Sequence, residues 1–133
     1  MRAVKRRESA GETPRTSRGL TSFHAGLAAE DQVSQLYDRS GRAVIARRWR
    51  GSIGEIDLIV REGDRVVFIE VKKSSSHALA AEHLTWGQMQ RIMATASEFV
   101  GGEPNGQNTE MRFDVALVDA MGRIEIIENA LAA

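Results

Sequence analysis

The chain has 133 residues, enough for one domain with a hydrophobic core and too few for two. Its 18 Lys and Arg residues balance its 18 Asp and Glu residues, so overall charge provides no general attraction to nucleic acid. The absence of cysteine excludes disulfides, thiolate zinc sites and cysteine nucleophiles. We expect a cytoplasmic protein with no membrane partner, because the sequence shows neither a membrane-spanning apolar stretch nor the apolar run of a secretory signal.

Residues 1–20 lack hydrophobic periodicity and are rich in Arg, Ser, Thr and Gly. Their basic residues outnumber Glu8 and Glu12, whereas the remaining chain is acidic by the same margin. Such segments are typical of disordered tails. We therefore expect a disordered basic arm over residues 1–20 and one folded domain over residues 21–133. A binding role for the arm and a solvated tail without a role are both open.

A helix is predicted from Thr21 or Ser22 to about Arg39, because Thr and Ser cap helix starts and Gly41 marks its end. Apolar residues recur along it at helical spacing: Phe23, Leu27, Val33, Leu36 and Tyr37. Glu30 falls on this apolar face, three residues after Leu27 and three before Val33. A carboxylate is therefore predicted to point toward the interior of the domain.

Strands are predicted over residues 43–50, 55–61 and 66–73, and the last two form a hairpin. A second helical region follows, clearest over residues 86–100. Its expected core face consists of Trp86, Met89, Ile92, Met93, Ala96, Phe99 and Val100. Two more strands are predicted over residues 111–118 and 123–127. The order α-β-β-β-α-β-β predicts an α/β fold, a single three-layer domain with a mixed central sheet and flanking helices.

The hairpin is the most informative segment, because strands rich in Val, Ile and Leu are normally buried and these also carry charges. Side chains alternate along a strand, so Glu70 shares a face with Lys72, and Asp57 shares a face with Glu55. A four-residue loop over residues 62–65 places Asp57 opposite Glu70 and Glu55 opposite Lys72, whereas a five-residue loop separates them. We predict the four-residue loop because it gives every charged group a partner.

Opposed carboxylates at Asp57 and Glu70 repel each other, so the pair needs a proton or a cation. Mg²⁺ prefers one or two protein carboxylates with waters and phosphate oxygens, and Glu30 offers a third carboxylate from the helix. Such a cation activates water, and Lys72 is placed to polarise that water. The pattern predicts a metal-dependent site for phosphodiester cleavage. The structural alternative is a Glu55–Lys72 ion pair, with Asp57 accepting hydrogen bonds from a turn.

Several segments together form a longer pattern over about residues 22–127. It consists of Gly26 with Glu30, Gly41, Gly54-Glu55-Ile56-Asp57-Leu58-Ile59, Val67-Phe68-Ile69-Glu70-Val71-Lys72 and Arg112-Phe113-Asp114-Val115. This pattern is similar to the YraN-type family of uncharacterised bacterial proteins. Asp57 and Glu70-Val71-Lys72 also resemble the PD-(D/E)xK nuclease superfamily, whose α-β-β-β-α-β core carries an acid on the second strand and Glu-x-Lys on the third.

The resemblance implies a restriction endonuclease-like fold and a Mg²⁺ or Mn²⁺ ion held by Asp57, Glu70 and the Val71 carbonyl. It implies that Glu30 is a further ligand, directly or through water. Lys72 would be the catalytic lysine. These roles come from the resemblance and add to the reading of the charged hairpin.

Further residues are expected to contact nucleic acid near this site. Gln88 stands where many relatives carry a lysine, and Lys73 adds a second positive charge after the motif. In the first strand, alternation places Arg48 and Arg50 on one face and Arg47 on the other. These arginines either follow the nucleic-acid backbone or protect an exposed sheet edge, and both interpretations are open.

Other polar residues carry weaker signals. Arg112 and Asp114 share a face of the fourth strand and are interpreted as a structural ion pair or as support for the site. The three histidines, His24, His77 and His83, lack the spacing of metal ligands. No phosphate-binding loop or dinucleotide motif occurs in the sequence.

The leading hypothesis is a Mg²⁺-dependent endonuclease that hydrolyses DNA phosphodiester bonds, with branched or structured DNA as one candidate substrate. RNA is an open alternative substrate. A different alternative is a non-catalytic nucleic-acid-binding or protein-interaction module on the same scaffold. A homodimer is also expected, because cutting both strands of a duplex takes two active sites.

Overall fold

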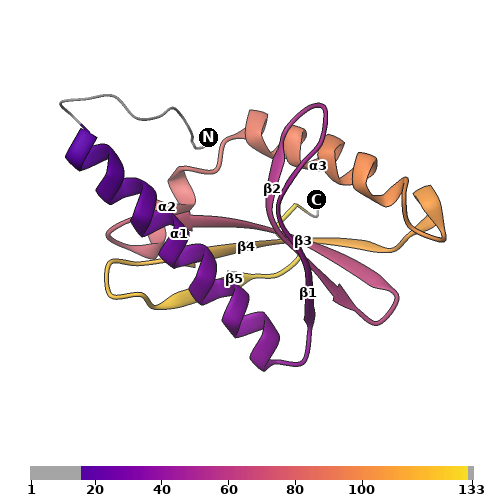
Figure 1. Cartoon of the computed structure of the whole chain (residues 1–133), viewed down its shortest axis with the longest axis horizontal. Coiled ribbons are helices and arrows are strands. Elements are labelled where there is room, and N and C mark those ends of the chain that lie inside the picture. The colour runs from indigo at the N-terminus through magenta and orange to yellow at the C-terminus, as the bar shows by residue number, and fades with distance from the viewer. Residues whose placement is uncertain (1–15, 132–133) are drawn as a thin grey trace.

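The computed structural model describes residues 16–131, so residues 1–15 of the expected basic arm lie outside the described part of the chain. A long helix, α1 (Thr16–Arg39), precedes three strands, β1 (Ala43–Arg50), β2 (Glu55–Glu62) and β3 (Arg65–Lys73). Two helices follow, α2 (His77–Glu82) and α3 (Trp86–Val100). A 3-10 turn at Gly106–Asn108 leads to the last two strands, β4 (Met111–Val118) and β5 (Ile124–Ile127) (Figure 1).

Two helical regions differ from their predicted extents. α1 begins at Thr16 instead of near Thr21, because no proline interrupts this stretch and Gly19 alone does not stop a helix. The region after β3 divides into α2 and α3, whereas the sequence predicts only residues 86–100 clearly. Ser76 begins α2, since its Oγ accepts a hydrogen bond from Leu79 N at 3.1 Å, as helix caps do.

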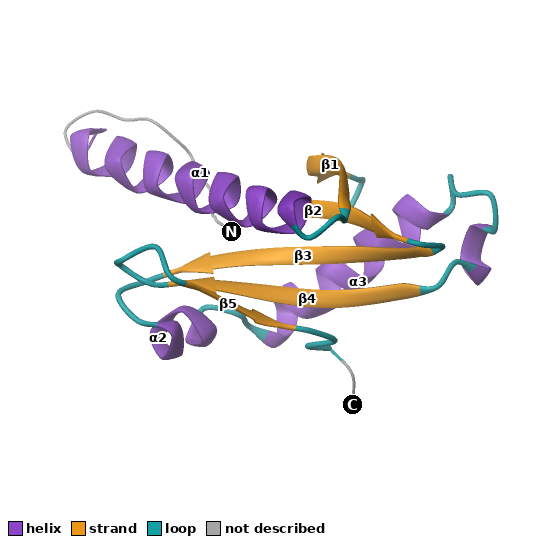
Figure 2. Ribbon diagram, turned by 90° about the horizontal axis from the view of Figure 1, so that it is seen from below, coloured by secondary structure: helices purple, strands orange, loops and turns teal. Residues whose placement is uncertain are grey.

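The five strands form one sheet in chain order, with β1 and β5 at its edges. β3 and β4 are parallel because α2 and α3 carry the chain back along the sheet, and all other neighbours are antiparallel. α1 covers one face of the sheet and α3 covers the other (Figure 2). This arrangement confirms the predicted α/β fold with three layers and a mixed sheet.

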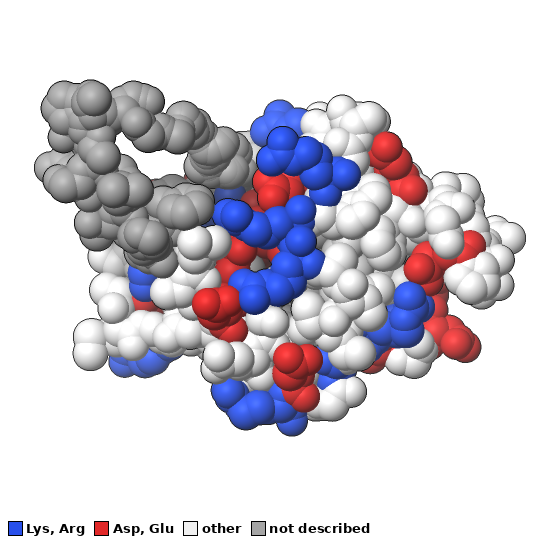
Figure 3. Space-filling view, viewed as in Figure 1, with Lys and Arg blue, Asp and Glu red and all other residues white. Residues whose placement is uncertain are grey.

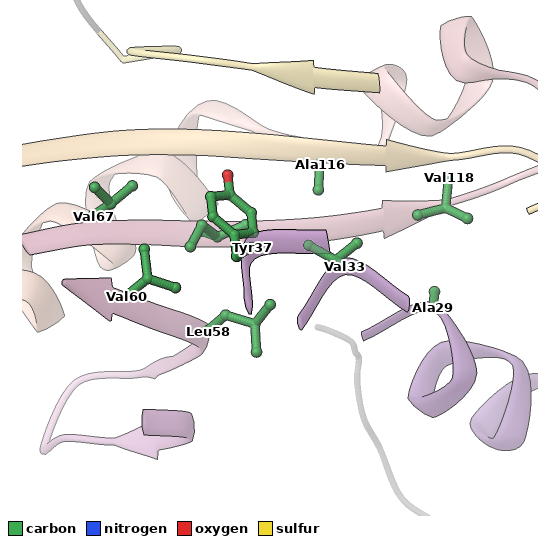
Figure 4. Close-up of a cluster of buried hydrophobic side chains, with 9 residues drawn as sticks. Ala29, Val33, Tyr37, Leu58, Val60, Val67, Ala116 and Val118 are labelled. Carbon is green, nitrogen blue, oxygen red and sulfur yellow. The ribbon is translucent and has the colours of Figure 1, made fainter. Parts of the chain in front are cut away.

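One hydrophobic core lies between α1 and the sheet. Its buried residues come from α1, β2, β3 and β4: Ala29, Val33, Tyr37, Leu58, Val60, Val67, Ile69, Ala116 and Val118 (Figure 4). Burying a Val, Leu or Ile side chain stabilises a fold by about 1.5–3 kcal/mol. The predicted inward stripe of α1 is confirmed at Val33 and Tyr37, and Glu30 lies inward beside it with an exposed fraction of 8%.

The second core lies between α3 and the opposite face of the sheet, where Ala96 and Val100 pack on β2 and β3. Two residues predicted for the core face of α3 are instead exposed, Trp86 by 68% and Met93 by 45%. That part of the prediction was wrong because the sheet-facing stripe includes Thr95, a polar residue. Thr95 is buried without penalty, since its hydroxyl donates to the Arg91 carbonyl at 2.7 Å.

The β2–β3 hairpin has the predicted register. Arg61 pairs with Val66 and Glu62 pairs with Arg65, so the ladder extends one step closer to the turn than expected. Gly63 in the turn has φ +63°, a left-handed conformation that glycine adopts at little cost. Continued along both strands, this register sets Asp57 across from Glu70.

Candidate active site

β2 and β3 separate beyond the Leu58–Ile69 pair, which is the last pair of their main-chain ladder. From there β2 follows β1 to the Arg50–Glu55 pair, whereas β3 stays paired with β4 to its end. The packing of β2 shows the same separation. Strict alternation would place Ile56 and Leu58 on one face, but Leu58 lies in the core on the α1 side and Ile56 in the core on the α3 side. The two strands therefore diverge where the predicted acids lie.

The turn between β1 and β2 is held against α3 and explains this divergence. Glu98 Oε1 accepts hydrogen bonds from the main-chain nitrogen of Ser52 at 2.9 Å and from its hydroxyl at 3.2 Å. Trp49 packs edge-on against Phe99, with ring centroids 5.2 Å apart. Gly51 permits the close approach, because a Cβ there would collide with Glu98 Oε1. These contacts direct the start of β2 toward α3 and away from β3.

Asp57 lies where the ladder between β2 and β3 ends. Its Oδ2 accepts a hydrogen bond from the main-chain N–H of Val71 at 2.8 Å, a group that a neighbouring strand would otherwise bind. A carboxylate thus replaces main-chain pairing on β3. The structural alternative predicted that Asp57 accepts hydrogen bonds from a turn. Asp57 does accept a main-chain hydrogen bond, but the donor lies in strand β3 and not in a turn.

Glu70 and Lys72 lie side by side on β3. Lys72 Nζ is 3.1 Å from Glu70 Oε2. The side chain of Lys72 is 10% exposed and that of Glu70 is 12% exposed. The alternative of a Glu55–Lys72 ion pair does not match this geometry, because Glu55 lies 3.8 Å from Arg50 of β1. Burying an ion pair carries a desolvation penalty that often exceeds its Coulomb gain, so this pair is a weak source of stability and a good candidate for function.

Burial raises the pKa of both acids at this position. The pKa of Asp57 lies well above its ordinary value because the group is buried and because Glu70 is nearby, while Val71 N–H and Lys72 act in the opposite direction. Burial also raises the pKa of Glu70, against the lowering effect of Lys72. Two neighbouring carboxylates repel each other, and a proton, the nearby Lys72 or a bound cation can compensate that repulsion. Their oxygens are the ligands that Mg²⁺ and Mn²⁺ prefer.

Glu30 approaches the same region from α1. Burial, and then the charge of Asp57, raise the pKa of Glu30 to about 8, whereas Arg48 and Arg47 lower it. Its Oε1 is buried and accepts no hydrogen bond from the described part of the chain, although Arg48 Nε lies 3.3 Å away. Within residues 16–131, no three His, Asp or Glu side chains come close enough together to enclose a metal ion. The donor set that fits a cation is therefore the pair Asp57 and Glu70, completed by other oxygens.

Arg48 has an unusual main-chain conformation for a strand residue. Its φ of +53° lies in the left-handed region that residues with a Cβ rarely adopt, and the register of β1 with β2 places it across from Asp57. The prediction that strict alternation places Arg47 and Arg48 on opposite faces of β1 was therefore wrong. Arg48 contacts Glu30 and Arg47 contacts Asp31, with 2.6 Å between Arg47 Nη2 and Asp31 Oδ1, so both reach α1.

Two residues predicted to bind nucleic acid have structural roles in the domain. Lys73 Nζ donates a hydrogen bond to the Asp119 carbonyl at 3.1 Å, in the turn between β4 and β5. Gln88 belongs to a capping box at the start of α3, where its main-chain nitrogen donates to Thr85 Oγ1 at 3.1 Å and its Oε1 accepts from Thr85 N at 3.4 Å. These contacts give Lys73 and Gln88 a place in the fold, and their contact with nucleic acid stays a prediction.

The arginines of β1 lie on an edge of the sheet. Figure 3 shows Lys and Arg side chains gathered over the region of β1 and β2, with Asp and Glu side chains among them. Arg47, Arg48 and Arg50 each lie within ion-pair distance of an acid. The edge position supports the interpretation that charge protects this strand from pairing with another chain. A contact with nucleic acid stays a prediction.

Arg112 and Asp114 form an ion pair that joins several elements. Arg112 Nε and Nη2 contact the two carboxylate oxygens of Asp114 at 2.9 and 3.1 Å. Tyr37 donates its hydroxyl to Asp114 Oδ2 at 2.9 Å, and the main-chain nitrogen of Asn129 donates to Oδ1 at 3.1 Å. The pair links α1, β4 and the segment after β5, which favours the structural interpretation of Arg112 and Asp114.

Sequence reasoning missed two features of this region, the hydrogen bond from Val71 to Asp57 and the contact between Arg48 and Glu30. Periodicity assigns side chains to faces, but it does not indicate where a ladder ends or where one strand residue is left-handed. The only available signal was Glu30 itself, an acid on an apolar helix face. Separately, no helix within residues 16–131 is both long and apolar enough to cross a membrane.

Known proteins are similar in sequence to most of this chain. The family model described as "Uncharacterised protein family UPF0102" matches residues 29–118, which include Glu30, Asp57, Glu70 and Lys72. A UPF0102 protein of Cereibacter sphaeroides strain KD131 is 67% identical over 115 residues, covering 86% of this chain and 98% of that protein. A UPF0102 protein of Ruegeria pomeroyi is 58% identical over 114 residues, covering 86% of this chain and 93% of that protein. A UPF0102 protein of Dinoroseobacter shibae is 47% identical over 115 residues, covering 86% of each chain. In agreement with the YraN-type resemblance, this chain belongs to the UPF0102 family.

Proposed function

We propose that the chain is a divalent-metal-dependent endonuclease that hydrolyses DNA phosphodiester bonds. The observation that carries the proposal is the partly buried Asp57–Glu70 pair, with Lys72 beside it, at the point where β2 and β3 separate. Two opposed acids in strands rich in Val and Ile oppose folding unless another group compensates them. The resemblance of Asp57 and Glu70-Val71-Lys72 to the PD-(D/E)xK pattern supports the same chemistry.

Asp57 and Glu70 would hold Mg²⁺ or Mn²⁺, with the Val71 carbonyl as a main-chain ligand. The cation supplies water activation and neutralises charge on the phosphate. Lys72 donates hydrogen bonds to the attacking water or to a phosphate oxygen, and its charge stabilises the transition state. Val71 N–H fixes the orientation of the Asp57 carboxylate, so less ordering remains to be done when the substrate binds.

The test uses variants that preserve side-chain size. Purified protein should cut forked or branched DNA in Mg²⁺ or Mn²⁺ and should stop cutting in EDTA. Asp57→Asn, Glu70→Gln and Lys72→Met should each lower the cleavage rate by about 10²–10⁴-fold, the typical contribution of such groups. Glu110→Gln, an exposed acid that pairs with Arg65 at the other end of the hairpin, should cut like the wild type. Cutting that survives all three site changes contradicts the proposal.

One observation favours the alternative of a non-catalytic module. Lys72 Nζ lies 3.1 Å from Glu70 Oε2 and Val71 N–H donates to Asp57 at 2.8 Å, so the chain's own groups compensate both acids without a cation. Calorimetric titration with Mn²⁺ separates the two functions. Binding that is lost in Asp57→Asn and Glu70→Gln supports the nuclease, whereas no binding in the wild type supports the module. Parallel RNA substrates decide between the two nucleic acids.

A homodimer is part of the proposal, because a duplex cut on both strands requires two sites. Light scattering at the concentration of the cleavage assay should give the mass of two chains. If the mass is that of one chain and double-strand cutting is intact, the dimer is contradicted, and the proposed active site is unaffected.

A further inference from the structure

Glu30 and Arg48 form a connected unit that the proposed chemistry leaves without a role. Glu30 lies on α1 with 8% exposure, and Arg48 on the edge strand β1 places its Nε 3.3 Å from Glu30 Oε1. The side chain of Arg48 is 44% exposed, so it extends from the buried acid toward solvent. The unit stands next to the candidate site, because the strand register sets Arg48 across from Asp57.

The main chain of Arg48 has an unusual conformation beside this contact. A left-handed residue with a Cβ costs about 1–2 kcal/mol, and such conformations persist only where surrounding contacts enforce them. The enforcing contacts are present on both sides, since Arg47 pairs with Asp31 of α1 and Trp49 packs on Phe99 of α3. Arg47 and Trp49 thus reach opposite faces of the sheet, and the left-handed Arg48 lies between them, where β1 changes face.

We propose that Glu30 is a positioning residue that holds Arg48 beside the Asp57–Glu70 pair, where Arg48 binds a phosphate of the nucleic-acid backbone. Glu30 is then not a ligand of the cation. The guanidinium group matches phosphate oxygens through its fork of N–H donors, and a buried acid beside Nε restricts the rotation of a long side chain. The absence of any three-acid cluster within residues 16–131 agrees with a site of two acids.

This inference rests on the proposed function for its substrate class, but it is tested by binding and not by cutting. The probe is a fluorescein-labelled forked DNA duplex in EDTA, and the readout is fluorescence anisotropy over a range of salt concentrations. Arg48→Ala should weaken binding about tenfold and reduce the slope of log affinity against log salt by about one. Arg65→Ala removes the same charge at the far end of the hairpin and should have a smaller effect on affinity.

The direction in which Glu30→Ala changes the DNA affinity decides whether Glu30 positions Arg48. The titration is run at pH 9, above the pKa of about 8 of Glu30, so that its carboxylate is charged. Removing a negative charge near DNA by itself strengthens binding, so a loss of affinity similar to that of Arg48→Ala identifies positioning. The double variant Glu30→Ala with Arg48→Ala should bind no worse than Arg48→Ala, because the two residues act as one unit. If Glu30→Ala does not fold, Glu30→Gln replaces it in the same cycle. Unchanged or stronger DNA binding in the Glu30 variant, full additivity, or no DNA binding by the wild type overturns the inference.

A second arm measures Mn²⁺ binding without DNA. Glu30→Gln should keep the Mn²⁺ affinity of the wild type within about twofold, whereas Asp57→Asn should weaken it by at least about tenfold, as loss of a ligand does. A loss in Glu30→Gln equal to that in Asp57→Asn makes Glu30 a ligand and overturns the inference. If the wild type binds no Mn²⁺, the proposed nuclease function fails, and the DNA arm alone decides the role of Glu30.

Discussion

Asp57 accepts a hydrogen bond from the main-chain N–H of Val71 at 2.8 Å, one step beyond the last main-chain pair of β2 and β3. An ordinary hairpin would continue its ladder there. The divergence of the strands leaves a main-chain donor that only a side chain can satisfy, and this donor in turn orients the carboxylate. The separation of β2 from β3 therefore also sets the orientation of Asp57 in the candidate site.

Asp57 variants should separate the hydrogen bond from the charge. Asp57→Asn keeps an oxygen for Val71 N–H and removes one of two neighbouring, partly buried acids, so stability in EDTA should not fall. Asp57→Ala leaves a main-chain donor unpaired and should lower the free energy of unfolding by about 1–3 kcal/mol. Urea unfolding followed by circular dichroism measures both. Equal losses in the two variants would show that the hydrogen bond is not the stabilising contact.

Stability should fall as the pH rises toward 8 in the absence of metal. The pKa of Glu30 is raised from 4.5 to about 8 on folding, so the folded chain binds a proton that the unfolded chain has released between these values. The stabilising contribution is complete below about pH 4.5 and is lost as pH passes about 8. Glu30→Gln should therefore show a shallower fall in unfolding free energy over this range. An identical pH profile for the variant would remove Glu30 as the cause.

Divalent cations should stabilise the protein more at pH 8 than at pH 6. Asp57 and Glu70 must release protons before they bind a cation, and both have raised pKa values. Mn²⁺ at about 100 times its dissociation constant adds about 2.7 kcal/mol to the free energy of unfolding. Thermal melting with Mn²⁺ and with EDTA measures the difference. Asp57→Asn is the control, and a Mn²⁺ effect that persists in it would place the cation elsewhere.

Tyr37→Phe should lower stability and leave the metal site unchanged. The hydroxyl of Tyr37 donates to Asp114 in the core, and its removal takes one hydrogen bond from a buried carboxylate, worth about 1.5–3 kcal/mol. Mn²⁺ affinity should equal that of the wild type, because Asp114 is satisfied by Arg112 and by Asn129 N. A loss of Mn²⁺ affinity in Tyr37→Phe would link Asp114 to the site.

Two glycine substitutions should have opposite signs. In Gly51→Ala the new Cβ collides with Glu98 Oε1 and lies 3.0 Å from the Trp49 ring, so the Glu98 carboxylate must leave Ser52 N and a hydrogen bond worth about 0.5–1.5 kcal/mol should be lost. In Gly87→Ala the nearest atom is Arg91 Nη1 at 3.7 Å, and replacing a helical glycine should stabilise by up to about 1 kcal/mol. Chemical unfolding compares the two. Because Gly51 docks the turn that separates β2 from β3, Gly51→Ala should also weaken Mn²⁺ binding.

Much of the fold follows from local patterns in the sequence. Helical spacing identified the inward face of α1, and alternation with turn residues identified the strands. The register that sets Asp57 across from Glu70 was chosen between two loop lengths because it gave each charge a partner, and that choice was correct although Lys72 pairs with Glu70 instead of Glu55. These patterns succeed because side-chain direction repeats regularly within an element. They failed at Trp86 and Met93, since the face that α3 buries depends on the shape of the sheet beneath it.

The sequence by itself determined that acids and a lysine share one hairpin, because composition and periodicity reside in neighbouring residues. Only the tertiary structure decided how these groups meet. The docking of the β1–β2 turn on Glu98 separates β2 from β3, and the left-handed Arg48 turns toward Glu30. Both features arise from contacts between elements far apart in the chain, and such contacts set where a ladder ends and which partner a buried charge finds.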